Sequence, residues 1–309
     1  MTSSPLSQHL SDYLAVRRAL GFKLVFPGQV LPQFVAYLET AGASTVTVEL
    51  AVAWAGLPQG RVQPISLAHR LGAVRGFARW LATIDPATEV PPCGIWPSTT
   101  PRPAPYLWSE SEILTLLDAA RRLASPIQAA THETLFGLLA CTGMRVGEAI
   151  GLARNDVDFD AGLITVRDGK FGRSRLVPLH PTTTEALRSY AVCRDRLCPN
   201  RRSTAFFVST VGTPLSYSGV RQTFVKLTTA AGLRTPTVRP RVHDMRHSFT
   251  VRSLLNWHRA GLDVGSRMAM LSTYLGHVNT SGTYWYLSAA PELMELVAAR
   301  LEGNIGGPR

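Results

Sequence analysis

A proline-rich segment divides this chain into two parts of unequal length. Proline lacks a backbone N–H donor and has a fixed φ angle, so a segment dense in proline is typical of an extended linker. We therefore predict an N-terminal domain over residues 1–90, a linker over residues 91–105 and a larger C-terminal domain over residues 106–309. The linker contains six prolines: Pro91, Pro92, Pro97, Pro101, Pro103 and Pro105.

The N-terminal part has the apolar periodicity of four helices, which we expect over about 7–20, 28–40, 48–55 and from 66 onward. Leu71, Val74 and Phe77 belong to the apolar stripe of the fourth helix. Three arginines, Arg70, Arg75 and Arg79, occupy other positions on that helix. They form either a solvated face or a face that lies along DNA phosphates.

The C-terminal part is predicted to be mostly α-helical with a small antiparallel sheet. Ser109 and Glu112 form a capping-box signal that begins its first helix. Further helices are expected over about 127–141, 145–153, 183–196, 217–230, 244–260, 264–275 and 291–301. Strands are expected over 163–167 and 173–179, joined by a glycine-rich turn, and over 205–209.

The charge of the chain indicates a polyanionic partner. The formal net charge is +11 and the isoelectric point is about 10.1. Residues 1–100 contain seven lysines and arginines against five acidic residues, whereas residues 101–309 contain 25 against 16. The excess of positive charge therefore lies mainly in the C-terminal part, as a nucleic-acid-binding surface would require.

Six separated residues of the C-terminal part have the chemistry needed to cut a phosphodiester. Two guanidiniums can hold its non-bridging oxygens with paired N–H donors. Two imidazoles and an amine can move protons, and a tyrosine can attack phosphorus. Lys170 is notable because Lys23 and Lys226 are the only other lysines, and an ammonium can give up a proton where a guanidinium cannot. The six residues are Arg145, Lys170, His243, Arg246, His277 and Tyr286.

These residues and their local contexts resemble the tyrosine recombinase (integrase) family over roughly residues 105–290. Arg145 follows Thr142-Gly143-Met144, and Arg246 lies in His243-Asp244-Met245-Arg246-His247. Leu275-Gly276-His277 is followed nine positions later by Tyr286. The resemblance implies an N-terminal helical core-binding (SAM-like) domain and a catalytic domain that together form a C-shaped clamp around duplex DNA.

The resemblance also implies a role for each residue. Tyr286 is the expected nucleophile, because its interval from His277 matches the family, whereas spacing alone does not exclude Tyr284. Lys170 protonates the 5′-oxygen leaving group, although Phe171 departs from the small residue often found there. Arg173 is the alternative to Lys170 for a phosphate or groove contact. Glu148 is expected to orient Arg145, and His247 to support the fold.

We therefore predict a site-specific recombinase that forms a 3′-phosphotyrosine without metal, cofactor or ATP. A tetramer on DNA, a Holliday-junction intermediate and docking of the C-terminal helix on a neighbouring protomer follow from the resemblance. Two alternatives remain: a type IB-like topoisomerase, and a DNA-binding protein that keeps the fold without turnover.

The remaining sequence signals concern the cellular location. The four cysteines, Cys93, Cys141, Cys193 and Cys198, show no zinc-binding spacing, which favours free thiols in a reducing compartment. We see no signal peptide and no apolar stretch of about 18 residues. A cytoplasmic, nucleoid-associated protein is expected.

Overall fold

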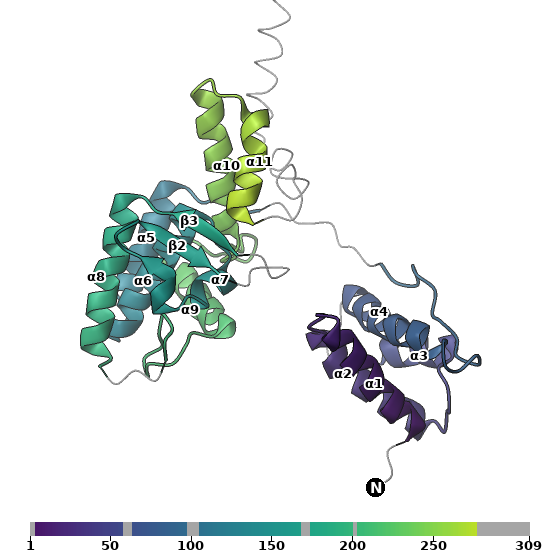
Figure 1. Ribbon diagram of the computed structural model, residues 1–309. Coiled ribbons are helices and arrows are strands. Elements are labelled where there is room, and N and C mark those ends of the chain that lie inside the picture. Colours follow the sequence, from purple (N-terminus) through teal and green to yellow (C-terminus); the bar gives the residue numbers. More distant parts are fainter. Residues whose placement is uncertain (1–3, 58–63, 98–104, 168–173, 200–202, 277–309) are drawn as a thin grey trace, which may run out of the picture. The chain divides into compact units, whose positions relative to one another are not determined.

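The computed structural model describes residues 4–57, 64–97, 105–167, 174–199 and 203–276. The chain divides into two compact units, Met1–Pro103 and Ala104–Arg309. The elements of both units are labelled in Figure 1.

The first unit is built from four helices, as the sequence predicts. The first begins two residues earlier than expected, because Pro5 occupies its first turn and the Ser4 side chain caps the backbone N–H of Ser7 at 3.1 Å. The second begins before Gly28, which lies inside the helix. The helices are α1 (Pro5–Ala19), α2 (Val25–Thr40), α3 (Val48–Gly56) and α4 (Pro64–Leu81).

Aromatic and aliphatic side chains from all four helices form the core of this unit. Phe34 of α2 packs on Trp54 of α3, with ring centroids 5.0 Å apart. Tyr13 of α1 packs on Phe77 of α4 at 5.6 Å. The apolar stripe predicted for the fourth helix is therefore confirmed as a core-facing surface, since Leu71, Val74 and Phe77 are buried.

Arg70 departs from the predicted basic face of α4. Its side chain is only 6% exposed, and its guanidinium lies 4.1 Å from the ring centroid of Trp54. Nη1 also donates to the carbonyl oxygens of Ala55 and Leu57, each at 3.3 Å. The expectation of an exposed Arg70 is wrong, because stacking on Trp54 and hydrogen bonds to the two carbonyls stabilise the guanidinium in its buried position.

The other two arginines of that face differ from each other. Arg75 is half-buried and donates from Nε to the Pro91 carbonyl at 2.7 Å and from Nη2 to the Pro92 carbonyl at 2.6 Å. Arg79 is exposed. Arg75 thus attaches the start of the proline-rich segment to α4, while Arg79 remains at the surface.

The second unit is mostly helical with one small antiparallel sheet, which confirms the predicted fold class. The strands follow the order β1-β2-β3, and Ile164 of β2 pairs with Val157 of β1 and Val177 of β3. The elements are α5 (Glu110–Arg121), α6 (Pro126–Thr142), α7 (Val146–Ile150), a 3₁₀ turn (Arg154–Asp156), β1 (Val157–Asp158), β2 (Leu163–Val166), β3 (Arg175–Pro178), α8 (Pro181–Leu197), α9 (Tyr217–Ala230), α10 (Asp244–Arg259) and α11 (Val264–Leu275).

Three local predictions for this unit need correction. The helix expected over 145–153 is only Val146–Ile150, because the Asp156 carboxylate accepts from the Ala153 N–H at 2.9 Å and begins a separate 3₁₀ turn. The strand expected over 205–209 is reduced to two isolated bridges. Conversely, the short strand β1 has no counterpart in the sequence prediction.

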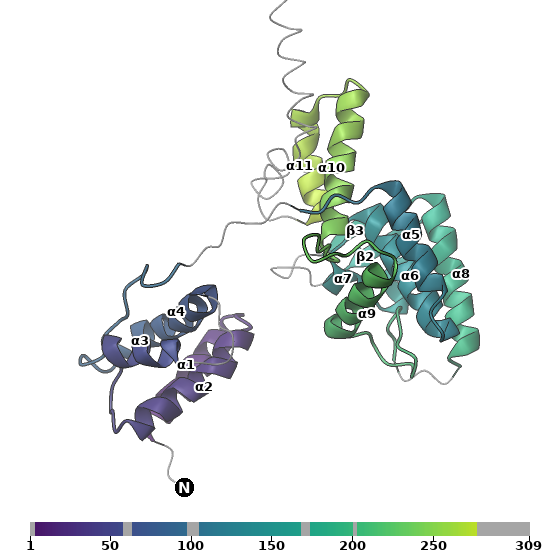
Figure 2. The same ribbon diagram turned by 180° about the vertical axis from the view of Figure 1, so that it is seen from behind.

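Two hydrophobic clusters organise the second unit. The larger lies among α5, α6, α8, α9 and the sheet, and includes Phe136, Phe206 and Phe224. The smaller joins α10 to α11 through residues such as Leu254, Met268 and Leu271. Figures 1 and 2 show α10 and α11 as an adjacent pair that extends away from the other helices of this unit. Among the described residues, no helix is both long and apolar enough to cross a bilayer.

Candidate active site

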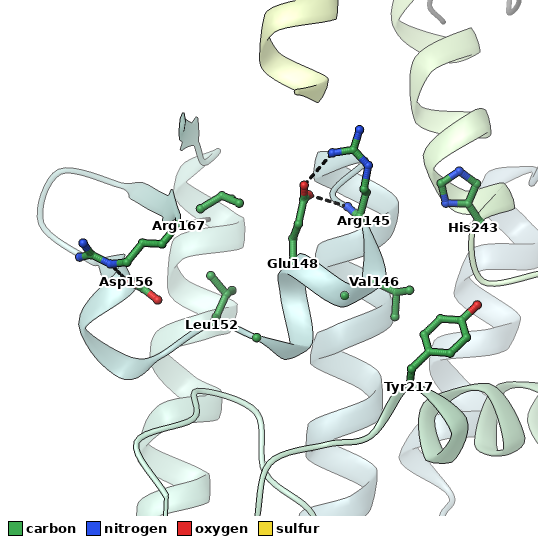
Figure 3. A pocket seen from close by; sticks show the side chains of 11 residues that line it. Arg145, Val146, Glu148, Leu152, Asp156, Arg167, Tyr217 and His243 are labelled. Carbon is green, nitrogen blue, oxygen red and sulfur yellow. Dashed lines mark hydrogen bonds and ion pairs between the residues drawn. The ribbon is translucent and has the colours of Figure 1, made fainter. Parts of the chain in front are cut away.

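A pocket of about 540 Å³ lies where α7, the sheet, α9 and α10 meet. Arg145 and Glu148 from the start of α7 line it, and Tyr217 from α9 and His243 from α10 form another side (Figure 3). Two residues singled out as catalytic in the sequence, Arg145 and His243, are therefore brought to one pocket from positions 98 residues apart. The pocket is open to solvent and carries cationic groups at its edge.

The N-cap position of α7 holds Arg145 beside Glu148. The Glu148 carboxylate accepts from the Arg145 backbone N–H at 3.0 Å and from its Nη1 at 2.7 Å. The Arg145 side chain remains 25% exposed, whereas that of Glu148 is 8% exposed. Glu148 therefore holds the guanidinium in place, and Figure 3 shows the two side chains next to each other with these contacts.

Three guanidiniums bind the last three carbonyls of the turn that ends α11. Arg175 Nε donates to Tyr274 O at 2.8 Å, Arg246 Nη2 to Leu275 O at 2.7 Å and Arg145 Nη2 to Gly276 O at 2.9 Å. A helix C-terminus presents unpaired carbonyls and a partial negative charge, so cations are favoured there. Residues 145, 175 and 246 are thus fixed around one backbone turn.

Arg246 is the buried member of this group. It is 2% exposed, and its Nη1 donates to the carbonyl of Gly143 at 2.9 Å. Gly143 and Gly276 are the left-handed C-caps of α6 and α11, with φ of 61° and 67°. Arg246 therefore joins the ends of two helices whose glycines belong to the sequence patterns around Arg145 and His277.

His243 is the N-cap residue of α10 and reaches solvent at the pocket. Enough protein surrounds the ring for desolvation to lower its pKa below the usual 6.5, and the positive charge of Arg246 lowers it further. Asp244 opposes that shift. The His243 imidazole is consequently neutral at pH 7 and can accept a proton.

His247 and Asp244 stabilise the beginning of α10. The His247 ring is buried and meets the His243 ring edge-on, with centroids 4.8 Å apart. The buried Asp244 carboxylate accepts from the Arg241 backbone N–H at 2.7 Å and from its Nη2 at 2.8 Å. These contacts fix the direction in which His243 leaves the helix.

Glu148 is the most strongly perturbed acid of the site. Burial by itself would raise its pKa, but hydrogen bonds from Arg175 and from the Arg145 backbone, with the charge of Arg175, lower the pKa to about 2. The carboxylate is therefore ionised at neutral pH. Its charge is compensated by two guanidiniums.

Several predicted site residues lie outside the described part of the chain. Lys170 and Arg173 fall between β2 and β3, and His277, Tyr284 and Tyr286 follow α11. The structure describes the segments on either side of 168–173 and the residue directly before His277. Their catalytic roles stay predictions.

Arg175 is a site residue that the sequence analysis missed. It lies on β3 and donates to both oxygens of Glu148, 27 positions earlier in the chain, at 3.0 and 2.8 Å. Within its own segment it is one basic residue of a strand, so only long-range contacts reveal it.

Among the described residues, no group of three His, Cys, Asp or Glu side chains could hold a metal ion.

Comparison with known proteins places this arrangement in a family. The model of the phage integrase family matches residues 108–292. A Sinorhizobium fredii protein named as an integrase/recombinase, y4rB, is 43% identical and covers 97% of this chain and 98% of its own. Tyrosine recombinase XerD of Mycobacterium tuberculosis is 32% identical over 72% of this chain and 69% of its own.

Solved structures show the same fold. The Tn1549 transposon integrase bound to transposon right-end DNA has a TM-score of 0.67 at 17% identity and covers 98% of this chain and 99% of its own. The XerH recombinase bound to difH DNA has a TM-score of 0.62 at 18% identity, over 83% of this chain and 73% of its own. From its family match, its relatives and its fold, this chain belongs to the phage integrase family of tyrosine recombinases.

Proposed function

We propose that this protein is a site-specific DNA recombinase that cuts and rejoins DNA through a 3′-phosphotyrosine. One observation carries the proposal. Arg145 and Arg246 come from segments about 100 residues apart, and both bind the turn that ends one residue before His277. This arrangement, in a member of the family, supports a role in phosphoryl transfer, which needs positive charge around the phosphate.

The proposed reaction begins with attack of the Tyr286 Oη on the scissile phosphorus. The P–Oη bond forms as the bond to the 5′-oxygen breaks, and Lys170 donates a proton to that oxygen. The neutral His243 accepts the tyrosine proton, which a free phenol with a pKa of about 10 does not release readily. A 5′-hydroxyl of a partner strand then attacks the phosphotyrosine and releases Tyr286.

The cationic groups stabilise the charge that develops on the phosphate. Arg145 presents a partly exposed guanidinium at the pocket, and Arg246 contributes positive potential from beneath it. His277 is proposed to donate a hydrogen bond to a non-bridging oxygen. Because the phosphotyrosine retains the bond energy of the phosphodiester, this scheme requires neither ATP nor a metal ion.

Duplex DNA is the proposed substrate, held between the two domains as in a C-shaped clamp. Several of the solved structures with this fold are DNA complexes, including a lambda integrase dimer bound to a core site. Arg79, which is exposed, and Arg173, which lies outside the described residues, are proposed phosphate contacts, and Arg75 is a weaker one because it binds linker carbonyls. Arg70 has no such role in the proposal because it is buried.

Assembly on DNA is proposed to be tetrameric, with the helix expected over 291–301 docked on a neighbouring protomer. A lone amphipathic helix must bury its apolar stripe, which motivates this part of the proposal. Removal of residues 291–309 should then abolish cooperative binding of two half-sites while leaving binding of one. Unchanged cooperativity in a gel-shift titration, with normal recombination, would reject the docking.

A nicked suicide substrate tests the proposed function. Duplexes from the DNA that flanks the gene are incubated with the protein in excess EDTA, and covalent complexes are separated on a denaturing gel. We expect an adduct that forms in the presence of EDTA. In this adduct the protein should be linked to the 3′ side of the cut. Loss of the adduct on chelation, with recovery on adding a divalent ion, would refute the metal-free scheme.

A plasmid-relaxation assay, run beside the adduct assay, separates the two alternatives. A topoisomerase of type IB would relax supercoiled plasmid that lacks a specific site, and a protein without turnover would give no adduct on any substrate.

A further inference from the structure

We infer that Arg175 is a positioning residue for DNA cleavage, which holds both Arg145 and the turn before His277 in place. This inference rests on the proposed function, because it concerns the same site. Arg175 itself is not among the residues that line the pocket.

The first part of the argument is the four-bond arrangement around the Glu148 carboxylate. Oε1 accepts from Arg145 Nη1 at 2.7 Å and from Arg175 Nη1 at 3.0 Å. Oε2 accepts from the Arg145 backbone N–H at 3.0 Å and from Arg175 Nη2 at 2.8 Å. Each oxygen is therefore held by both arginines, so the carboxylate cannot turn without losing bonds to each.

This arrangement makes the direction of Arg145 depend on Arg175. Arg175 binds Glu148 with two parallel N–H donors, a geometry that fixes the plane of the carboxylate. The side chains of Arg175 and Glu148 are 12% and 8% exposed, so water competes little with these bonds. Without Arg175, each carboxylate oxygen would keep only its bond to Arg145, so the carboxylate and the Arg145 guanidinium could shift together.

The second part of the argument is the contact with the end of α11. Arg175 Nε donates to Tyr274 O, two residues before the Gly276 carbonyl that Arg145 binds. A β-carbon on Gly276 would lie 2.8 Å from Arg175 Nη1 and 3.1 Å from its Cζ. The guanidinium thus occupies the space of a side chain at 276, and only glycine permits this approach directly before His277.

Through these two contacts, Arg175 supports two groups with proposed catalytic roles, Arg145 and His277. Arg175 connects strand β3 to Arg145 through Glu148, and to the backbone that leads into His277. A lysine at position 175 would keep the charge but would lack the fork that binds both carboxylate oxygens and the Tyr274 carbonyl together. Arg175→Lys is therefore the informative change.

The test measures the rate of covalent adduct formation by full-length protein on two nicked substrates. One has an ordinary scissile phosphate. The other has a methylphosphonate there, which lacks one negative charge and so has less need of a well-aimed guanidinium. Melting temperature and affinity for the duplex are measured in parallel, and Arg188→Lys on α8 is the matched control, since Arg188 also binds a carboxylate, that of Glu185.

We expect Arg175→Lys to bind DNA as the wild type does and to form adduct roughly 10- to 100-fold more slowly on the phosphate, as small displacements of catalytic groups do. On the methylphosphonate its deficit should shrink to within about threefold, since the charge that Arg145 stabilises is reduced. Gly276→Ala, which displaces the Arg175 guanidinium from the opposite side, should show the same pattern. Arg188→Lys should match the wild type on both substrates.

The possible results separate this inference from the proposed function. Equal rates for Arg175→Lys and wild type on the phosphate, or equal deficits on both substrates, would overturn the positioning role while leaving the recombinase proposal intact. Absence of adduct with the wild type on every substrate would overturn the proposed function and, with it, any role of Arg175 in cleavage.

Discussion

The ring of Phe249 on α10 occupies the space that a side chain at Gly143 would need. A β-carbon on Gly143 would lie 2.5 Å from Cδ1 of that ring. Gly143 also has a φ of 61°, which disfavours other residues. The close approach matters for the site, because the Gly143 carbonyl is the acceptor of Arg246 Nη1. The glycine before Arg145 is thus required by packing as well as by its backbone angle.

Gly143→Ala should therefore destabilise the protein. Overpacking and the left-handed conformation together are expected to lower the free energy of unfolding by about 2 to 4 kcal/mol, measured by urea denaturation. Gly137→Ala in α6 is the control, since no atom lies within 4 Å of its added β-carbon. That change should stabilise the helix by about 0.5 to 1 kcal/mol. Equal effects of the two changes would show that Phe249 imposes no constraint.

Glu148→Gln should alter how stability depends on pH. The folded pKa of Glu148 is about 2, below the ordinary 4.5, so its stabilising contribution is complete above pH 4.5 and is lost as the pH falls toward 2. The difference corresponds to about 3 kcal/mol. The gap in unfolding free energy between wild type and variant should therefore be largest at neutral pH and narrow between pH 4.5 and 2. A gap that stays constant over this range would contradict the ion network.

The pH profile of cleavage should depend on His243. Desolvation and the charge of Arg246 lower its pKa below 6.5, so the neutral base persists into mildly acidic solution. Adduct formation should decline only at pH values below 6.5 as the ring becomes protonated. His243→Gln should be slower by roughly 100-fold or more and should lack this acid limb. An unchanged acid limb in the variant would exclude His243 as the proton acceptor.

Two arginines of α4 should behave differently, although the sequence places them on one helix. Arg79→Gln should weaken DNA binding and reduce the slope of log affinity against log salt by about 1, with little change in stability. Arg70→Gln should lower the free energy of unfolding by about 1 to 3 kcal/mol, because it removes a buried donor. Gel-shift titrations in a salt series and thermal melts distinguish the two. If Arg70→Gln reduced the slope of log affinity against log salt more than Arg79→Gln, Arg70 and not Arg79 would be the DNA contact.

Local signals predicted most of the helices. Ser109 and Glu112 do form a capping box, with the Ser109 N–H donating to the Glu112 carboxylate at 2.8 Å. The helix over 264–275 ends at a left-handed Gly276, as a glycine stop predicts. These signals succeed because caps and glycine stops act within one turn of the residues that carry them.

The failures at Arg70 and Arg175 share a dependence on distant partners. Arg70 is buried because its guanidinium stacks on Trp54 of another helix. Arg175 binds Glu148 and Tyr274, which lie 27 and 99 positions away in the sequence. The short helix after Arg145 has a different cause, because Asp156 caps the Ala153 N–H only three positions earlier, a local signal that the sequence analysis did not use. The partners of Arg70 and Arg175 cannot be identified from the spacing of residues along one sequence.

The covalent adduct shows which tyrosine is the nucleophile. Covalent complexes trapped on a nicked substrate are digested with trypsin and nuclease, and the modified peptide is mapped by mass spectrometry. We predict a nucleotide attached to Tyr286, no adduct with Tyr286→Phe despite normal DNA binding, and persistent adduct with Tyr284→Phe. A modification on Tyr284, or an adduct that survives Tyr286→Phe, would contradict the account.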